Sequence, residues 1–409
     1  MKKATLFPLL LALFAHSCGK QDIDPVTMAL SGPLGSPLVT EDLIIVGSQD
    51  GNLYAIDRTS GKKLWNYKAG DYAGLVVYKN LVYVSPRGKG ELHAVNIADG
   101  KLAWVFEAGH TVHDYRDKFI NGIPSIYGNR LYVSSEDWNV YMLDPRTGKE
   151  LARLILDEEP QAMEIAISEG VGYIGAWDGY LYAINLDDLT LIWKSETNND
   201  HIGQTTYSRE TGLGWISDNP NGKLLNQQAP YVTVVPLVGK TKVYFADWAG
   251  NLMAVNKSDG KQVWRHSPST RNMRHVGPRH YLSEYQNIIY YGTLEDGHIY
   301  GVDKTSGERV FETETGTMIN GPMFSAGRFA FTLEYTMDAD GNVDWSLPIV
   351  KLFDMKTREF QPGPDGVGSF PYIVDETTYL GLADGRIVSI DMDSGVEQLV
   401  LGPEIKGRP

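Results

Sequence analysis

The chain has 409 residues, a formal net charge of −14 at pH 7 and a hydrophobic content of 42%, which is the composition of an ordinary globular protein. A nucleic-acid-binding protein usually carries a basic face, so this charge disfavours nucleic acid as a partner. Beyond the N-terminus, no apolar stretch is long enough for a membrane-spanning helix.

The first residues predict a targeting segment. Lys2 and Lys3 precede the apolar run "ATLFPLLLALFA", and the segment ends in "AHSC" at Cys18, the only cysteine of the chain. This resembles a bacterial lipoprotein signal, which implies a signal peptide over 1–17, a lipid anchor on Cys18 and a tether over 18–30. Gly19 after the cysteine favours the outer membrane, facing the periplasm, with membrane contact through the lipid only. The alternative is an ordinary secretory signal peptide that happens to contain a cysteine.

A repeated unit occupies the rest of the chain. "LYAIDRTSGKKLW", which ends at Trp65, alternates like a strand, turns at an Asp and a Gly, and continues as a second strand. A hairpin precedes it, so each unit predicts four antiparallel strands. The turn residue recurs eight times, mostly 37 to 51 residues apart, at Asp57, Asn96, Asp144, Asn185, Asn256, Asp303, Asp354 and Asp391. We therefore predict an all-β fold, an eight-bladed β-propeller in one domain over 31–409. The 71-residue gap before Asn256 predicts an insertion at about 195–228. Two separate domains are the alternative.

The repeats also predict contacts between blades. Two residues before the turn and eight after it, four units pair Ala with Trp; the third unit reverses the sizes with Met142 and Ala152, and the eighth has Ser389 and Leu399. We interpret this as a large side chain that packs over a small one where two blades meet. The tryptophans with this structural docking role are Trp65, Trp104, Trp193 and Trp264.

The unit "A-x-[DN]-x-x-x-G-x-x-x-W" resembles the quinoprotein (PQQ-like) repeat with its tryptophan-docking motif, over about 33–402. The resemblance implies the eight-bladed fold and leaves the function open. Quinoprotein alcohol dehydrogenases hold PQQ against a disulfide of two adjacent cysteines, beside a metal ion. Only Cys18 is present here, so no cofactor is expected and a PQQ-dependent dehydrogenase is disfavoured.

Tryptophans mark one candidate surface. Trp138, Trp177 and Trp248 fall in the turn between the second and third strands of three consecutive blades, beside Asp137, Asp178 and Asp247, and Trp215 lies in the insertion. These turns share one face of a propeller with the loops between blades. Aromatic side chains gathered there favour recognition of a protein or a glycan. The alternative is that each ring folds back over its own blade.

Two loops on the same face carry further candidates. A basic segment in this acidic chain contains Arg265, His266, Arg271, Arg274, His275, Arg279 and His280. It could hold a phosphate, a sulfate or a uronate, or be a solvated loop that balances nearby acids. "HTVHD" (His110, His113 and Asp114) has metal-ligand chemistry, but histidines in a loop need not converge, so we predict no metal site.

Two functions follow as hypotheses. A lipid-anchored propeller with these repeats resembles the lipoprotein family of the machinery that folds outer-membrane β-barrels, which implies a non-catalytic scaffold with a protein partner in the cell envelope. The alternative is an envelope propeller that binds a glycan or anion, or an enzyme acting on such a ligand. In that case the four surface tryptophans would stack on sugar rings, and a walled pocket would join them to Arg274 and His275.

Overall fold

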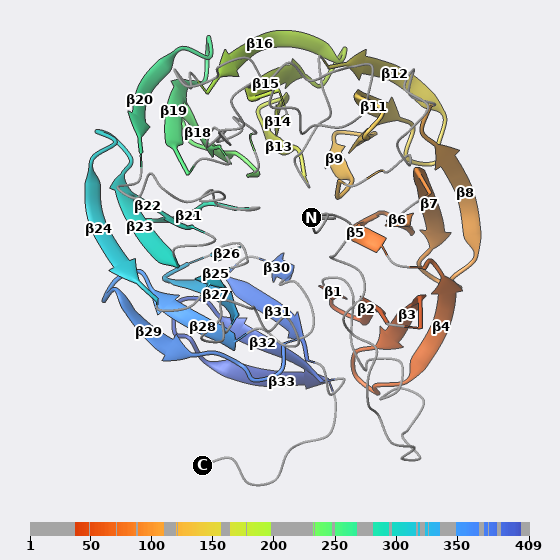
Figure 1. Ribbon diagram of the computed structural model, residues 1–409. Coiled ribbons are helices and arrows are strands. Elements are labelled where there is room, and N and C mark those ends of the chain that lie inside the picture. The colour runs from red at the N-terminus through yellow and green to blue at the C-terminus, as the bar shows by residue number, and fades with distance from the viewer. Residues whose placement is uncertain are drawn as a thin grey trace, which may run out of the picture.

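The computed structural model describes residues 37–401 except 49, 71, 87–88, 110–119, 121, 157–163, 177, 198–231, 233, 248–249, 268–280, 294–296, 316–317, 320–323, 326, 336–348, 368–371, 375 and 383–385. The described residues form strands and no helix, arranged in eight antiparallel sheets. Figure 1 shows the sheets following one another around a ring, with the first strand of each blade near the centre and the fourth at the rim. The predicted all-β, eight-bladed propeller is confirmed.

The first four blades are each built from four consecutive strands. Blade 1 contains β1 (Leu38–Val39), β2 (Leu43–Gly47), β3 (Asn52–Asp57) and β4 (Lys63–Lys68). Blade 2 contains β5 (Tyr72–Tyr78), β6 (Leu81–Pro86), β7 (Glu91–Asn96) and β8 (Leu102–Glu107). Blade 3 contains β9 (Ser125–Tyr127), β10 (Arg130–Ser134), β11 (Asn139–Leu143) and β12 (Glu150–Ile155). Blade 4 contains β13 (Ala166–Ser168), β14 (Val171–Gly175), β15 (Tyr180–Asn185) and β16 (Thr190–Glu196).

The last four blades repeat this order, with one variation in blade 7. Blade 5 contains β17 (Leu237–Val238), β18 (Lys242–Ala246), β19 (Leu252–Asn256) and β20 (Gln262–His266). Blade 6 contains β21 (Ser283–Tyr285), β22 (Ile288–Gly292), β23 (His298–Asp303) and β24 (Arg309–Glu314). In blade 7 the inner position is split between β25 (Met318–Ile319) and β26 (Phe324–Ser325), which both pair with β27 (Phe329–Tyr335), followed by β28 (Ile349–Asp354) and β29 (Glu359–Pro362). Blade 8 contains β30 (Tyr372–Val374), β31 (Thr377–Gly381), β32 (Ile387–Asp391) and β33 (Glu397–Leu401).

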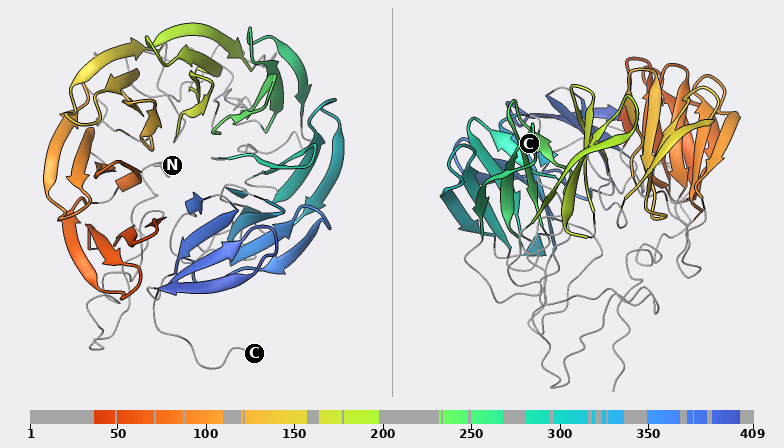
Figure 2. Two further views of the ribbon diagram at one scale, coloured as in Figure 1. Left: turned by 180° about the vertical axis from the view of Figure 1, so that it is seen from behind. Right: turned by 90° about the horizontal axis from the view of Figure 1, so that it is seen from above.

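The second and third strands of a blade are buried on both faces. In β3 the four residues from Leu53 to Ile56 are all buried, because one face packs against blade 2 and the other against blade 8. Figure 2 shows the ring of blades from behind and from above. An alternating sequence is typical of a half-buried strand, and this expectation is wrong for β3. Alternating burial belongs instead to the rim strand β4, where Leu64 is 52% exposed and Trp65 is 7% exposed.

Trp65 joins blade 1 to blade 2. Ala55 is its cross-strand partner inside the same blade, in the β3–β4 ladder. The indole crosses to the next blade, where its Nε1 donates to the Ile97 carbonyl oxygen at 2.8 Å and its ring lies over Gly100. A small residue beside Trp65 was thus predicted correctly, but it is a neighbour in the same blade and not the contact between blades.

The same kind of contact recurs around the ring. Trp104, Trp193 and Trp264 lie over Gly148, Gly260 and Gly307 of the following blades, and each indole donates to a carbonyl there. At two seams the tryptophan and the facing glycine are both absent, whereas Gly395 and Gly61 at two other seams face Phe329 and Leu401. Ala152 packs against the cluster that contains Leu189, and the Arg358 guanidinium lies 5.2 Å from the centre of the Phe311 ring. At the four tryptophan seams, a large ring therefore packs over a position without a side chain.

Blade 8 closes the ring on blade 1 by side-chain packing. Ile387 and Leu401 join Val46 and Ile56 in one buried cluster, and Leu401 approaches the Gly61 position. In β32, Ser389 pairs with Gln398 because of a register shift, so the predicted pair with Leu399 is wrong and Leu399 is 39% exposed. In the described part of the chain, no strand from the N-terminal end joins the sheet of blade 8, and no strand from the C-terminal end joins the sheet of blade 1.

Several predicted segments lie outside the described residues: the signal peptide, Cys18, the tether and all but the first three residues of the 195–228 insertion. β16 runs to Glu196 at the start of that insertion. None of the described elements is a helix long and apolar enough to cross a membrane.

Candidate functional site

The turns between the second and third strands are braced by a pair of side chains. Asp50 accepts a hydrogen bond from the Tyr54 hydroxyl at 2.6 Å, and Asp137 and Asp178 accept from the hydroxyls four residues later, Tyr141 and Tyr182. Burial and the Asp50 carboxylate raise the pKa of Tyr54 to about 12, so this tyrosine stays protonated and continues to donate. The sequence analysis did not detect this pairing, although its Asp-x-x-x-Tyr spacing repeats in three blades.

Hydrogen bonds of this kind hold the aspartates that the sequence predicted to be part of a binding surface. Asp178 is half-buried and is occupied by its own hairpin, where it accepts from Tyr182 and from the Tyr180 backbone N–H at 2.9 Å. Asp247 is 0% exposed and accepts from both the backbone and the side-chain nitrogen of Asn251. The prediction that Asp247 belongs to an exposed binding surface is therefore wrong: its carboxylate stabilises a turn.

Trp138 is the one predicted surface tryptophan within the described ranges. It is half-buried and has a φ of 70°, and its backbone N–H and carbonyl bond to Ser135 and Leu156. The other candidates lie outside the described residues: Trp177, Trp215, Trp248, Arg271, Arg274, His275, Arg279, His280, His110, His113 and Asp114. A tryptophan surface and an anion-binding loop therefore stay predictions.

Only the start of the basic segment is described. His266 ends β20 and packs edge-on against Tyr291 of blade 6, with 6.4 Å between ring centres, and against Tyr300 at 6.2 Å. Burial, and secondarily the charge of Arg309, lower the pKa of the His266 imidazole. His266 is therefore a neutral side chain in the contact between blades 5 and 6, and it adds no positive charge to the segment at pH 7.

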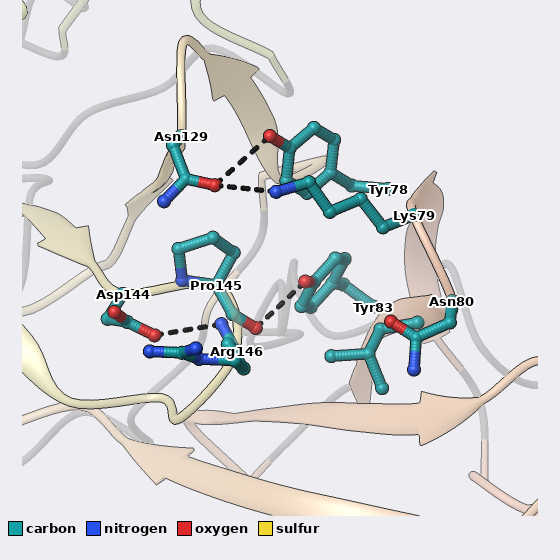
Figure 3. A pocket seen from close by; sticks show the side chains of 9 residues that line it. Tyr78, Lys79, Asn80, Tyr83, Asn129, Asp144, Pro145 and Arg146 are labelled. Atoms are coloured by element: carbon teal, nitrogen blue, oxygen red, sulfur yellow. Dashed lines mark hydrogen bonds between the residues drawn. The ribbon is translucent and has the colours of Figure 1, made fainter.

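A pocket opens on the opposite face, between blades 2 and 3. It has a volume of about 170 Å³ and is lined by two groups of side chains. Blade 2 supplies the turn between β5 and β6 with the start of β6, and blade 3 supplies Asn129 and the turn after β11. Figure 3 shows these residues around the hollow: Tyr78, Lys79, Asn80, Leu81, Tyr83, Asn129, Asp144, Pro145 and Arg146.

Hydrogen bonds across the seam fix the shape of this pocket. The Tyr78 hydroxyl donates to the Gly128 carbonyl at 3.0 Å, and Lys79 Nζ donates to Asn129 Oδ1 at 2.9 Å. Deeper in the seam, the buried Tyr83 hydroxyl donates to the Pro145 carbonyl at 2.8 Å, and burial is the main cause that raises its pKa. Two phenol rings and a proline thus form the wall, and two cationic side chains stand at its edge.

No group of three or more His, Cys, Asp or Glu side chains in the described ranges is placed to hold a metal ion. Asp178 is hydrogen-bonded in its own turn, and the His266 ring packs in the seam between blades 5 and 6. The described side chains form a framework with a surface pocket.

An eight-bladed propeller of PQQ-like repeats is a class of protein that contains both enzymes and binding proteins. Comparison with known families shows to which family within this class the chain belongs. The family described as outer membrane protein assembly factor BamB matches this chain in three overlapping segments, 19–218, 89–277 and 178–401. The chain belongs to this family.

Individual relatives are distant. The chain is 24% identical over 272 residues to tetrathionate hydrolase of Acidithiobacillus ferrooxidans, covering 54% of this chain and 53% of that protein. It is 24% identical over 170 residues to BamB of Escherichia coli, covering 42% and 40%. For BamB of Moranella endobia the identity is 25% over 280 residues, covering 59% and 67%. The aligned part is thus about half or less of the first two relatives.

Solved structures with the same fold agree with the family. BamB from Moraxella catarrhalis superposes with a TM-score of 0.61 at 14% identity, over 87% of this chain and 96% of that one. The quinohemoprotein alcohol dehydrogenase ADHIIG from Pseudomonas putida gives 0.59 at 15% identity, over 88% and 70%. At such identities these likenesses concern the fold alone.

Proposed function

We propose that this protein is a non-catalytic scaffold of the cell envelope that acts in the assembly of outer-membrane proteins. The observation that carries the proposal is the match to the BamB family across residues 19–401. Two BamB proteins among the relatives support it, as does the ring itself. In three blades an aspartate and a tyrosine brace the turn between the second and third strands, which suits a rigid platform that presents loops to a partner.

The same proposal includes the place of the protein in the cell. A lipid on Cys18 would hold the ring at the outer membrane, on the periplasmic side, with no membrane contact except the lipid. Replacement of Cys18 by serine removes the thiol that a lipid needs. We expect the serine variant to leave the membrane fraction while wild type stays in it. Equal partitioning of both proteins would overturn the lipid anchor and leave the scaffold proposal standing.

The scaffold itself is tested by isolation from its native membrane. The lipidated full chain, carrying an affinity tag after Pro409, is purified from gently solubilised envelopes, and its companions are quantified by mass spectrometry. We expect a barrel-assembly subunit in an amount comparable to the protein. Recovery of the protein without any such subunit, under conditions that keep other envelope complexes intact, would overturn the proposal.

One comparison favours a second candidate. The similarity to tetrathionate hydrolase over 54% of the chain agrees with the alternative of an envelope propeller that binds an anion or a glycan, or that acts on one. Titration calorimetry with tetrathionate, and with acidic and neutral oligosaccharides, tests this alternative. Saturable binding of one of these compounds would support it, and heats of dilution alone for all of them would remove it.

A further inference from the structure

The seam between blades 2 and 3 differs in charge from the seam between blades 4 and 5. Between blades 4 and 5, Lys257 is neutralised by Glu169, with Nζ and Oε2 2.6 Å apart. Between blades 2 and 3, Lys79 Nζ instead donates to the neutral amide oxygen of Asn129. Among the described residues, Arg146 forms no ion pair with a carboxylate within 4 Å. Two cations with no close carboxylate partner therefore flank one pocket.

Asp144 is the single carboxylate of that pocket, and its own turn occupies it. It accepts the backbone N–H groups of Arg146 and Thr147, both at 2.9 Å, and the Thr147 hydroxyl at 3.0 Å. Burial opposes ionisation, but the hydrogen bonds from Thr147 and the charge of Arg146 outweigh it and lower the pKa of Asp144. With Asp144 ionised, the lining has two positive charges and one negative charge, in a chain whose net charge is −14.

We propose that the pocket between blades 2 and 3 is a docking site for an acidic segment of a protein partner. The guanidinium of Arg146 and the ammonium of Lys79 would contact a carboxylate, since charge-assisted hydrogen bonds of this kind are strong and directional. Tyr78 and Pro145 would pack against the aliphatic part of the same side chain. This inference rests on the proposed scaffold function and names one surface through which a partner is held.

The position of the two cations favours a protein over a free anion. Lys79 and Arg146 are exposed and belong to two different blades, so they mark the rim of a hollow and do not enclose it. Exposed charges at a rim raise the association rate and the specificity for a protein partner more than they raise the affinity. The pocket is fixed by hydrogen bonds of the seam, so it needs no rearrangement before a partner docks.

The experiment compares two charge reversals of equal size in the full chain. The test variant is Lys79→Glu with Arg146→Glu. The matched control is Lys62→Glu with Lys149→Glu, two exposed lysines that lie on the same face and do not line the pocket. Lys149 follows Arg146 in the same turn, so the control also tests whether that turn tolerates substitution. Circular dichroism and thermal unfolding verify that both variants fold.

The probe is a fluorescein-labelled peptide with four consecutive glutamates, and its counterpart has glutamines instead. Fluorescence anisotropy measures binding of each peptide at low ionic strength. We expect the glutamate peptide to bind wild type, to bind the test variant at least about tenfold more weakly, and to bind the control within about twofold of wild type. The glutamine peptide should bind at least about tenfold more weakly than the glutamate peptide.

Several results would overturn the inference. Equal weakening by both charge reversals would show long-range attraction without a site, and equal binding of the two peptides would remove the role of the carboxylates. Tighter binding of inorganic phosphate, with the same sensitivity to Lys79→Glu and Arg146→Glu, would assign the pocket to a phosphate. The peptide titration uses isolated protein and is independent of the isolation from envelopes. If the peptide does not bind but the envelope complex is recovered, the docking site is refuted and the proposed scaffold function stands.

Discussion

The packing of the Trp65 ring over Gly100, which joins blades 1 and 2, can be tested by adding one methyl group at Gly100. A Cβ atom on Gly100 would lie 2.8 Å from Cδ2 of Trp65, whereas a Cβ atom on Gly128 meets nothing within 4 Å. Both glycines have positive φ, +70° and +60°, so alanine at either position costs about 1–2 kcal/mol of backbone strain. At Gly100 the clash adds about 1–3 kcal/mol. We therefore expect Gly100→Ala to lower the free energy of unfolding by about 2–5 kcal/mol, clearly more than Gly128→Ala.

A second substitution shows whether the ring of Trp65 is the cause. Trp65→Ala alone should cost about 3–5 kcal/mol. In that background the clash is gone, so Gly100→Ala should cost only its backbone strain, which gives a coupling energy of about 1–3 kcal/mol. The assay is urea unfolding followed by far-UV circular dichroism, with tyrosine fluorescence as the check that the transition has two states. Equal costs for both glycines, or additive effects of Trp65→Ala and Gly100→Ala, would refute the packing described here.

Three further predictions follow from other contacts. Lys351→Met should lower the free energy of unfolding by about 3–5 kcal/mol, because it removes the ammonium group 2.6 Å from the fully buried Glu334 carboxylate; urea unfolding measures this, and a loss below about 1 kcal/mol would contradict it. Leu401→Ala should cost about 2–3 kcal/mol at the ring closure, and hydrogen exchange should show both terminal blades less protected; exchange confined to blade 8 would argue against closure by packing. Although burial raises the pKa of Asp354, hydrogen bonds from Arg328 and backbone N–H groups lower it to about 2. The stability from this carboxylate is therefore present above the unfolded pKa of about 4 and is lost as pH falls toward 2. Asp354→Asn should reduce the melting temperature most at neutral pH and least near pH 2, and a reduction that does not change with pH would refute this assignment.

The propeller was predictable because its signal is repeated. Eight turn residues at similar spacing show eight units, and a unit of four strands cannot bury both of its faces alone, so it has to pack against its neighbours. The sequence did not show which residues meet across a seam. Ala55 and Trp65 are paired in one ladder, and spacing alone does not tell a partner in the same blade from one in the next blade. The Ser389 pairing failed for a similar reason, since a register shift of one residue leaves no mark in the spacing.

The candidate sites were less predictable. Asp247 was predicted to be a surface carboxylate because turns are usually exposed. It is instead buried and accepts a hydrogen bond from the Asn251 side chain. The pocket between blades 2 and 3 has no sequence motif, because its lining comes from turns as far apart as Tyr78 and Arg146. Such a site exists only once two blades lie side by side. Predicting it requires the seam geometry, which the pattern of strands does not contain.

Ring closure by packing gives this protein a thermodynamic property that linear repeat proteins lack. In an open array the end repeats have one neighbour each, so they fray and need special capping sequences. Here Leu401 and Gly61 bring the two terminal blades together, so every blade has two neighbours. Detaching blade 8 breaks two seams, and so does detaching any other blade. The first opening event is then the parting of a single seam anywhere in the circle, and the weakest of the eight seams, not the position of the chain ends, sets where the structure yields.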